Sequence, residues 1–223
     1  MINADEIFSD SDKRIALWCG DAEDTNDLAI LADNIIENKV VLISVPPNVL
    51  SFMWTCLEKS NVKIFTRYGF EASNKNIDTN ISQLSENIIS VQKQGADGVQ
   101  IFIKLRDFDR FVDMIGLVRD DLFFEHDLCI VFNVQDIAIN EWEHVFNKLR
   151  EIRANAFGLV FDEDMGNRSD FIGRIYGMLD NWCFDGDLHF MFGNNFERID
   201  QTIRLIESMK PELVNKIHFF LEY

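Results

Sequence analysis

The stretch Gly95-Ala-Asp-Gly-Val-Gln-Ile-Phe-Ile-Lys-Leu-Arg-Asp-Phe108 contains the strand pattern on which the fold prediction rests. One face of this strand is wholly apolar and β-branched, and it holds Val99, Ile101 and Ile103. The other face carries two polar groups, and it holds Gln100, Phe102 and Lys104. Helices against one face and a partly polar interior against the other are typical of a parallel barrel, whose functional sites lie where the strands end. We therefore expect Lys104 at such an end, pointing inward.

Strand and helix patterns alternate along the whole chain at intervals of about thirty residues. The predicted strands cover 14–19, 40–45, 62–67, 98–104, 128–134, 157–162, 187–192 and 217–222. The predicted helices cover 24–38, 47–59, 78–94, 108–122, 141–153, 169–182 and 196–209. This order predicts a single domain over residues 1–223, a (β/α)8 TIM barrel of eight parallel strands that lacks its eighth helix. Residues 1–12 form an N-terminal extension.

Two residues mark helix ends in this pattern. Pro47 suits the first turn of a helix, because its missing N–H would have no partner there. Gly95 follows the third helix, where a glycine commonly ends a helix.

The composition excludes several classes of function. A net charge of -17 at pH 7 argues against nucleic acid and against an anionic membrane, since both require a basic surface. The four cysteines lie far apart, as free thiols of a reducing compartment do, and no signal peptide is evident, so we expect a cytoplasmic protein. The sequence has neither a G-x-G-x-x-G motif nor a P-loop, and it predicts no cofactor.

If polar strand residues face the barrel interior, five of the strands each carry one polar residue near their own C-terminal end. These residues are Arg67, Lys104, Asn133, Asp162 and Glu222. We predict Lys104 and Asp162 as catalytic residues, and the following as ligand-binding residues: Arg67, Arg106, Asn133, Asp136 and Asn194. His189 and His218 share the inward parity on neighbouring strands, and we expect them to be hydrogen-bonded core histidines.

Between Val40 and Lys104 the sequence resembles the deoxyribose-phosphate aldolase family of class I aldolase barrels. Three segments carry the resemblance: Ile43-Ser-Val-Pro-Pro-Asn-Val49, Val62-Lys-Ile-Phe-Thr-Arg-Tyr-Gly-Phe70 and Gly95-Ala-Asp-Gly-Val-Gln100. The resemblance implies Schiff-base chemistry with a lysine on the sixth strand, a second lysine on the seventh and an aspartate on the fourth. The aligned positions in this chain are Val160, Met191 and Gln100. Valine and methionine cannot replace an amine nucleophile, so the family's own mechanism is absent.

Two interpretations follow. In the first, the protein keeps the scaffold without the chemistry and binds a small polar or phosphorylated metabolite at the C-terminal strand ends. In the second, it is a carbon–carbon lyase in which Lys104 forms the Schiff base, as in transaldolase-like barrels, and Asp162 or Asp136 relays protons. An ion pair of Lys104 with Asp162 or Glu222 would instead keep this amine protonated and inert.

A third interpretation is metal-assisted chemistry at the run Asp162-Glu163-Asp164, although we favour the interpretation of this run as a solvated loop before a helix. We expect the partner to be a small carbonyl compound or a sugar phosphate, whose phosphate would depend on Arg67, Lys104 or Arg106. Without an eighth helix, part of the barrel wall is left uncovered. We expect it to be covered either by the N-terminal dozen residues or by a second copy of the chain in a homo-oligomer.

Overall fold

The structure is a computed structural model that describes residues 15–19, 25–70, 77–123, 125–161, 168–193 and 195–222. Residues 1–12 and several residues of the predicted site lie outside the described residues. These site residues are Asp162, Glu163, Asp164 and Asn194.

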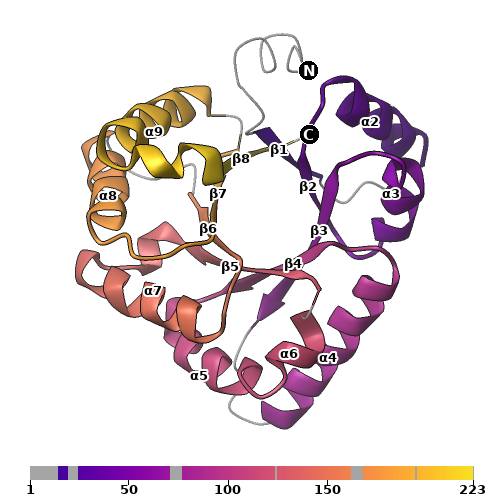
Figure 1. The fold of residues 1–223 in the computed structure, drawn as a ribbon, viewed down its shortest axis with the longest axis horizontal. Coiled ribbons are helices and arrows are strands. Elements are labelled where there is room, and N and C mark those ends of the chain that lie inside the picture. Colours follow the sequence, from indigo (N-terminus) through magenta and orange to yellow (C-terminus); the bar gives the residue numbers. More distant parts are fainter. Residues whose placement is uncertain are drawn as a thin grey trace.

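Eight parallel strands form a closed barrel in which every strand pairs with its neighbours in sequence and the last pairs with the first. The strands are β1 (Ile15–Trp18), β2 (Leu42–Val45), β3 (Lys63–Phe70), β4 (Gly98–Ile103), β5 (Asp127–Asn133), β6 (Ala156–Val160), β7 (Asp187–Met191) and β8 (Ile217–Glu222). Figure 1 shows the strands as an inner ring with the helices around it. The predicted (β/α)8 barrel is therefore confirmed.

The helices lie outside the barrel, between consecutive strands (Figure 1). They are α2 (Thr25–Glu37), α3 (Leu50–Leu57), α4 (Ile77–Lys93), α5 (Leu105–Ile115), α6 (Arg119–Phe123), α7 (Trp142–Glu151), α8 (Arg168–Asp180) and α9 (Phe196–Met209). Short 3₁₀ turns cover Val134–Asp136, Ile139–Glu141 and Pro211–Lys216. The last described strand, β8, ends at Glu222.

Two local predictions need correction, and one is confirmed. The helix predicted over 108–122 is two helices, because α5 ends before Gly116 and a turn separates it from α6. Pro47 lies in the turn before α3, not in its first helical turn. Gly95 has a φ of +97°, and a Cβ atom there would meet the ring of Trp54, so the chain requires glycine at this helix end.

The barrel has separate inner and outer cores. The outer core packs the apolar strand faces, including Val99, Ile101 and Ile103, against the helices. The inner core holds Ala16, Leu42, Phe65, Cys129, Val131, Ala156, Met191 and Phe220, with Trp18, Val41, Phe102 and Val160 beside it. The alternation of faces expected from the sequence is therefore present. No helix among the described residues is long and apolar enough to cross a membrane.

Candidate functional site

A buried polar chain runs through the middle of the barrel. The hydroxyl of Ser44 donates to Oε1 of Gln100 over 2.6 Å, and Nε2 of Gln100 lies 3.4 Å from Nδ1 of His189. Sγ of Cys129 also lies 3.4 Å from that nitrogen. All four residues are buried, so each polar group requires a partner here. Gln100, which aligns with the aldolase aspartate, is thus held in an internal hydrogen-bond network.

Arg67 lies on the C-terminal side of this hydrogen-bond network and connects the ends of β1 and β2. Its guanidinium donates to the carbonyl oxygen of Cys19 over 2.6 Å and to that of Ser44 over 3.2 Å. It also stacks over the ring of Trp18 at 4.4 Å, and that ring meets Phe102 edge-on. Arg67, which was predicted to bind a ligand, therefore stabilises the barrel rim.

Asn133, the last residue of β5, also has a local task. Its side-chain oxygen accepts a hydrogen bond of 2.9 Å from the backbone N–H of Gln135, which caps the 3₁₀ turn Val134–Asp136. This cap fixes the turn on which the predicted residue Asp136 is carried.

Three of the predicted site residues line one pocket beside the barrel rim. The pocket has a volume of about 480 Å³, and Lys104, Leu105, Arg106, Asp109, Asp136, Glu141 and His144 line it. Lys104 follows the last residue of β4 and is the N-cap of α5, while Asp136 follows β5. The pocket therefore opens at the C-terminal strand ends, where sites of such barrels lie.

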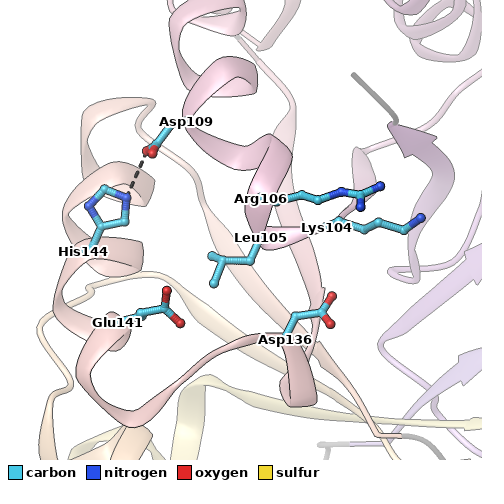
Figure 2. Close-up of a pocket in the computed structure, with 7 residues that line it drawn as sticks. All are labelled: Lys104, Leu105, Arg106, Asp109, Asp136, Glu141 and His144. Carbon is cyan, nitrogen blue, oxygen red and sulfur yellow. Dashed lines mark hydrogen bonds and ion pairs between the residues drawn. The ribbon is translucent and has the colours of Figure 1, made fainter. Parts of the chain in front are cut away.

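Lys104 and Arg106 extend to one side of this pocket, and Asp109, Glu141 and His144 lie on the other. Figure 2 shows the exposed side chains of Lys104 and Arg106 extending together from the start of α5, away from His144. Nε2 of His144 lies 2.9 Å from Oδ1 of Asp109, so α7 and α5 are joined across the pocket (Figure 2). The Glu141 side chain accepts a hydrogen bond of 2.7 Å from the N–H of Ala138, which holds the second 3₁₀ turn.

Three residues that line the pocket are not among the site residues predicted from the sequence, and these are Asp109, Glu141 and His144. They lie on the helix side of the sheet, and an inward-facing strand pattern does not detect that side. Glu141 and His144 are three residues apart at the start of α7, a spacing that places two side chains on one helix face. That spacing was the signal available in the sequence.

The histidines of the inner core differ in their partners. His189 is hydrogen-bonded as expected, but Nδ1 of His218 is buried and has no hydrogen-bond partner among the described residues. The expectation for His218 is therefore wrong, because its ring turns toward Asp187 at the N-terminal end of the barrel, where Nε2 and Oδ2 are 3.9 Å apart.

No metal site is visible in the part of the chain that the structure describes. Within it, no three His, Cys, Asp or Glu side chains are grouped so that they could hold a metal ion. The run of carboxylates considered for metal-assisted chemistry, Asp162 to Asp164, lies outside the described residues.

Comparison with known proteins supports the fold but shows no relationship in sequence. No protein-family model matches the chain, and no curated protein matches it. A candidate deoxyribose-phosphate aldolase of Toxoplasma gondii ME49 superposes with a TM-score of 0.66 at 12% identity, covering 94% of this chain and 88% of that one. The tetrameric deoxyribose phosphate aldolase of Aeropyrum pernix gives 0.61 at 10% identity, covering 80% and 75%.

A solved barrel that is not named as an aldolase superposes on this chain about as well. A candidate copper homeostasis protein CutC of Streptococcus agalactiae gives a TM-score of 0.61 at 10% identity and covers 94% of this chain and 98% of that one. Identities this low establish the fold alone, and one fold carries many functions. The chain is a closed (β/α)8 barrel whose solved structural neighbours include deoxyribose-phosphate aldolases.

Proposed function

We propose that this protein is a divergent aldolase-like barrel that binds a small phosphorylated metabolite, such as a sugar phosphate, without the Schiff-base activity of the aldolases. The observation that carries the proposal is the pocket at the ends of β4 and β5, where Lys104 and Arg106 stand together at the start of α5. Asp136 and Glu141 also line this pocket.

The start of α5 suits a phosphate group. The first N–H groups of a helix and its dipole favour an anion, and α5 is an eleven-residue helix. The side chain of its N-cap residue, Lys104, caps no backbone N–H and is exposed beside Arg106. Two cations and a helix start in one pocket match a phosphate better than any neutral group.

The acidic groups of the pocket suit hydroxyl groups. Asp136 is exposed and Glu141 is half-buried, and carboxylates accept hydrogen bonds from sugar hydroxyls. A metabolite that carries both a phosphate and hydroxyls would use the cations and the carboxylates. This is the chemistry expected of a sugar phosphate.

The barrel interior supports the loss of aldolase chemistry. Val160 and Met191, which align with the family's two lysines, are paired neighbours on β6 and β7 and face the inner core. Neither side chain can form an imine. Gln100, at the aspartate position, is held by Ser44 and His189.

Binding can be tested by calorimetry with deoxyribose 5-phosphate, a compound that the neighbours' name suggests, and with unphosphorylated deoxyribose. We expect the phosphate ester to bind more tightly, and Arg106→Gln to weaken it about tenfold, as loss of a charge-assisted contact does. Arg204→Gln is the matched control, since both arginine side chains are 76% exposed and each pairs with an aspartate. Equal affinity for both sugars, or equal losses in both variants, would reject the proposal.

One observation favours a second candidate function, an aldolase that uses Lys104. This lysine shares its pocket with Asp136, which could relay protons. The amine would attack a carbonyl carbon, and loss of water would leave an imine that borohydride reduces to a stable secondary amine. Intact mass after borohydride treatment with small aldehydes should then show an adduct that Lys104→Met removes and the exposed control Lys59→Met keeps.

A further inference from the structure

The turn Val134–Asp136, which carries Asp136 at the pocket of the C-terminal strand ends, is held by an arginine from outside that pocket. Nη1 of Arg174, on α8, donates to the carbonyl oxygen of Val134 over 3.1 Å. The same oxygen accepts the N–H of Ile137 over 3.3 Å, the hydrogen bond that closes the turn. Among the described residues that line the pocket, none belongs to α8. The turn is thus fixed from a neighbouring strand–helix unit.

The guanidinium of Arg174 is itself held in place. Its Nε lies 3.3 Å from Oδ2 of Asp170, one helical turn earlier on α8. The Arg174 side chain is partly buried, and Val134 is fully buried. A hydrogen bond from a charged donor to a carbonyl shielded from water is stronger than one between neutral groups. Arg174 therefore restrains the backbone of the turn and not merely its surface.

The turn has few other restraints at its first residues. It is three residues long, and on its other side the side-chain oxygen of Asn133 accepts the N–H of Gln135 over 2.9 Å. Asp136 itself is exposed, so its carboxylate is placed by the backbone that carries it. A carboxylate on a fixed backbone loses less conformational freedom when it accepts a hydrogen bond from a ligand. The hydrogen bond to Val134 therefore prepares Asp136 for binding.

We propose that Arg174 is a positioning residue for hydroxyl recognition in this pocket: by holding the carbonyl of Val134, it fixes the turn that presents the Asp136 carboxylate to a sugar hydroxyl. This inference rests on the proposed function and assigns Arg174 no contact with the ligand. The phosphate group, by contrast, depends on Lys104, Arg106 and the start of α5. Loss of Arg174 should therefore separate the two parts of recognition, as a side chain that supports a site from behind does.

The test is calorimetry with deoxyribose 5-phosphate and, separately, with inorganic phosphate. Arg174→Met should weaken binding of the sugar phosphate about fivefold, the size of one lost hydrogen bond, while the affinity for inorganic phosphate does not fall. Asp136→Asn should also weaken the sugar phosphate. The double variant should bind it no more weakly than Asp136→Asn alone, because Arg174 acts through Asp136.

Arg204→Met is the matched control. Arg204 pairs with Asp200 on α9 across the same four-residue spacing that joins Arg174 to its aspartate. This variant removes an equivalent charge pair from the neighbouring helix, and it should leave the affinities for both ligands unchanged.

Amide hydrogen exchange tests the turn without any ligand. The N–H of Ile137 should exchange faster in Arg174→Met than in the wild type or in Arg204→Met, while near-UV circular dichroism shows that the fold is kept. Arg174→Lys is a milder second variant, since one ammonium lacks the planar fork that reaches Asp170 and Val134 together, and it should show the same pattern at smaller size.

Three results overturn the inference: equal losses of affinity for the two ligands in Arg174→Met, additive losses in the double variant, or unchanged exchange of the Ile137 amide. A wild type that does not prefer the phosphate ester to deoxyribose rejects the proposed function and this inference with it. A wild type that prefers the ester, beside an Arg174→Met variant that binds it equally well, rejects this inference alone.

Discussion

At the scale of the residue, Arg67 was predicted to bind a ligand, and its side chain instead stabilises the fold. Its planar guanidinium reaches the carbonyl oxygens at the ends of β1 and β2 at once and covers the Trp18 ring. A lysine has the same charge, but it lacks the planar group with several N–H donors that can reach two acceptors at once. The rim of the barrel between β1 and β3 therefore depends on arginine.

Arg67→Gln should lower the free energy of unfolding by about 2 kcal/mol, since hydrogen bonds from a charged group to buried acceptors are lost. Arg67→Lys should recover less than half of this loss. Urea unfolding measures both, with the exposed Arg204→Gln as the control, which should change stability little. A full recovery with lysine would show that charge alone matters at this rim.

The buried histidine of β7 makes stability depend on pH. Burial, helped by the charges of His218 and Lys63, lowers the pKa of His189 well below its usual 6.5. In acid the unfolded chain therefore binds a proton that the native state refuses, and the free energy of unfolding falls as the pH drops below 6.5. Asp187, whose pKa is raised above 3.8, acts in the opposite direction, because the native state binds its proton first.

We expect urea unfolding to show a loss of stability between about pH 7 and pH 5.5, and a smaller loss in His189→Gln. The glutamine keeps an acceptor for Gln100 but does not titrate. His218, whose pKa is also lowered, preserves part of the dependence in the variant. Parallel pH profiles for the wild type and the variant would contradict this assignment.

At the scale of the element, neighbouring strands fit inside the barrel because small residues face large ones. Gly158 of β6 is the registered neighbour of Val131 of β5, and both belong to the inward parity. A Cβ atom at Gly158 would lie 2.8 Å from the Cγ2 atom of Val131, and its three nearest atoms all belong to that valine side chain. The fit of β5 to β6 therefore depends on this pair.

Gly158→Ala should lower the free energy of unfolding by about 1–3 kcal/mol through overpacking. Val131→Ala alone should also destabilise, by leaving a cavity. The double variant should lose clearly less than the sum of the two, which a double-mutant cycle from urea unfolding measures. Additive losses would mean that the strands relax independently of this contact.

At the scale of the whole molecule, a closed barrel is combined with strong negative charge. The pairing of β8 with β1 leaves no free sheet edge in the barrel, while the net charge of -17 repels itself across a compact surface. The single domain, the cytoplasmic location and the homo-oligomer stay predictions.

Self-repulsion predicts that salt stabilises the protein. Raising sodium chloride from about 20 mM to 200 mM at pH 7 should raise the thermal midpoint, because screening weakens repulsion between exposed charges. Near the isoelectric point of 4.5 the same addition should have little effect, and scanning calorimetry at both pH values compares them. A fall of the midpoint with salt at pH 7 would show that attractive pairs outweigh the net charge.

The sequence by itself determined the order of the elements and the direction of their faces. Alternation in the stretch from Gly98 to Ile103 and helical spacing between strands report which side of each element is buried, and burial is a property of the element and its immediate cover. For this reason the eight strands, the inner face with Gln100 and Phe102, and the glycine at Gly95 agreed with the structure.

Only the tertiary structure decided what each polar group meets. The partners of Arg67 are 23 and 48 residues away in sequence, Lys104 stands with Glu141 and His144 across two helices, and His218 faces Asp187 instead of a hydrogen-bond partner. Such contacts depend on ångström distances between elements that barrel closure brings together. A one-dimensional pattern records which residues are buried, but it does not record these distances.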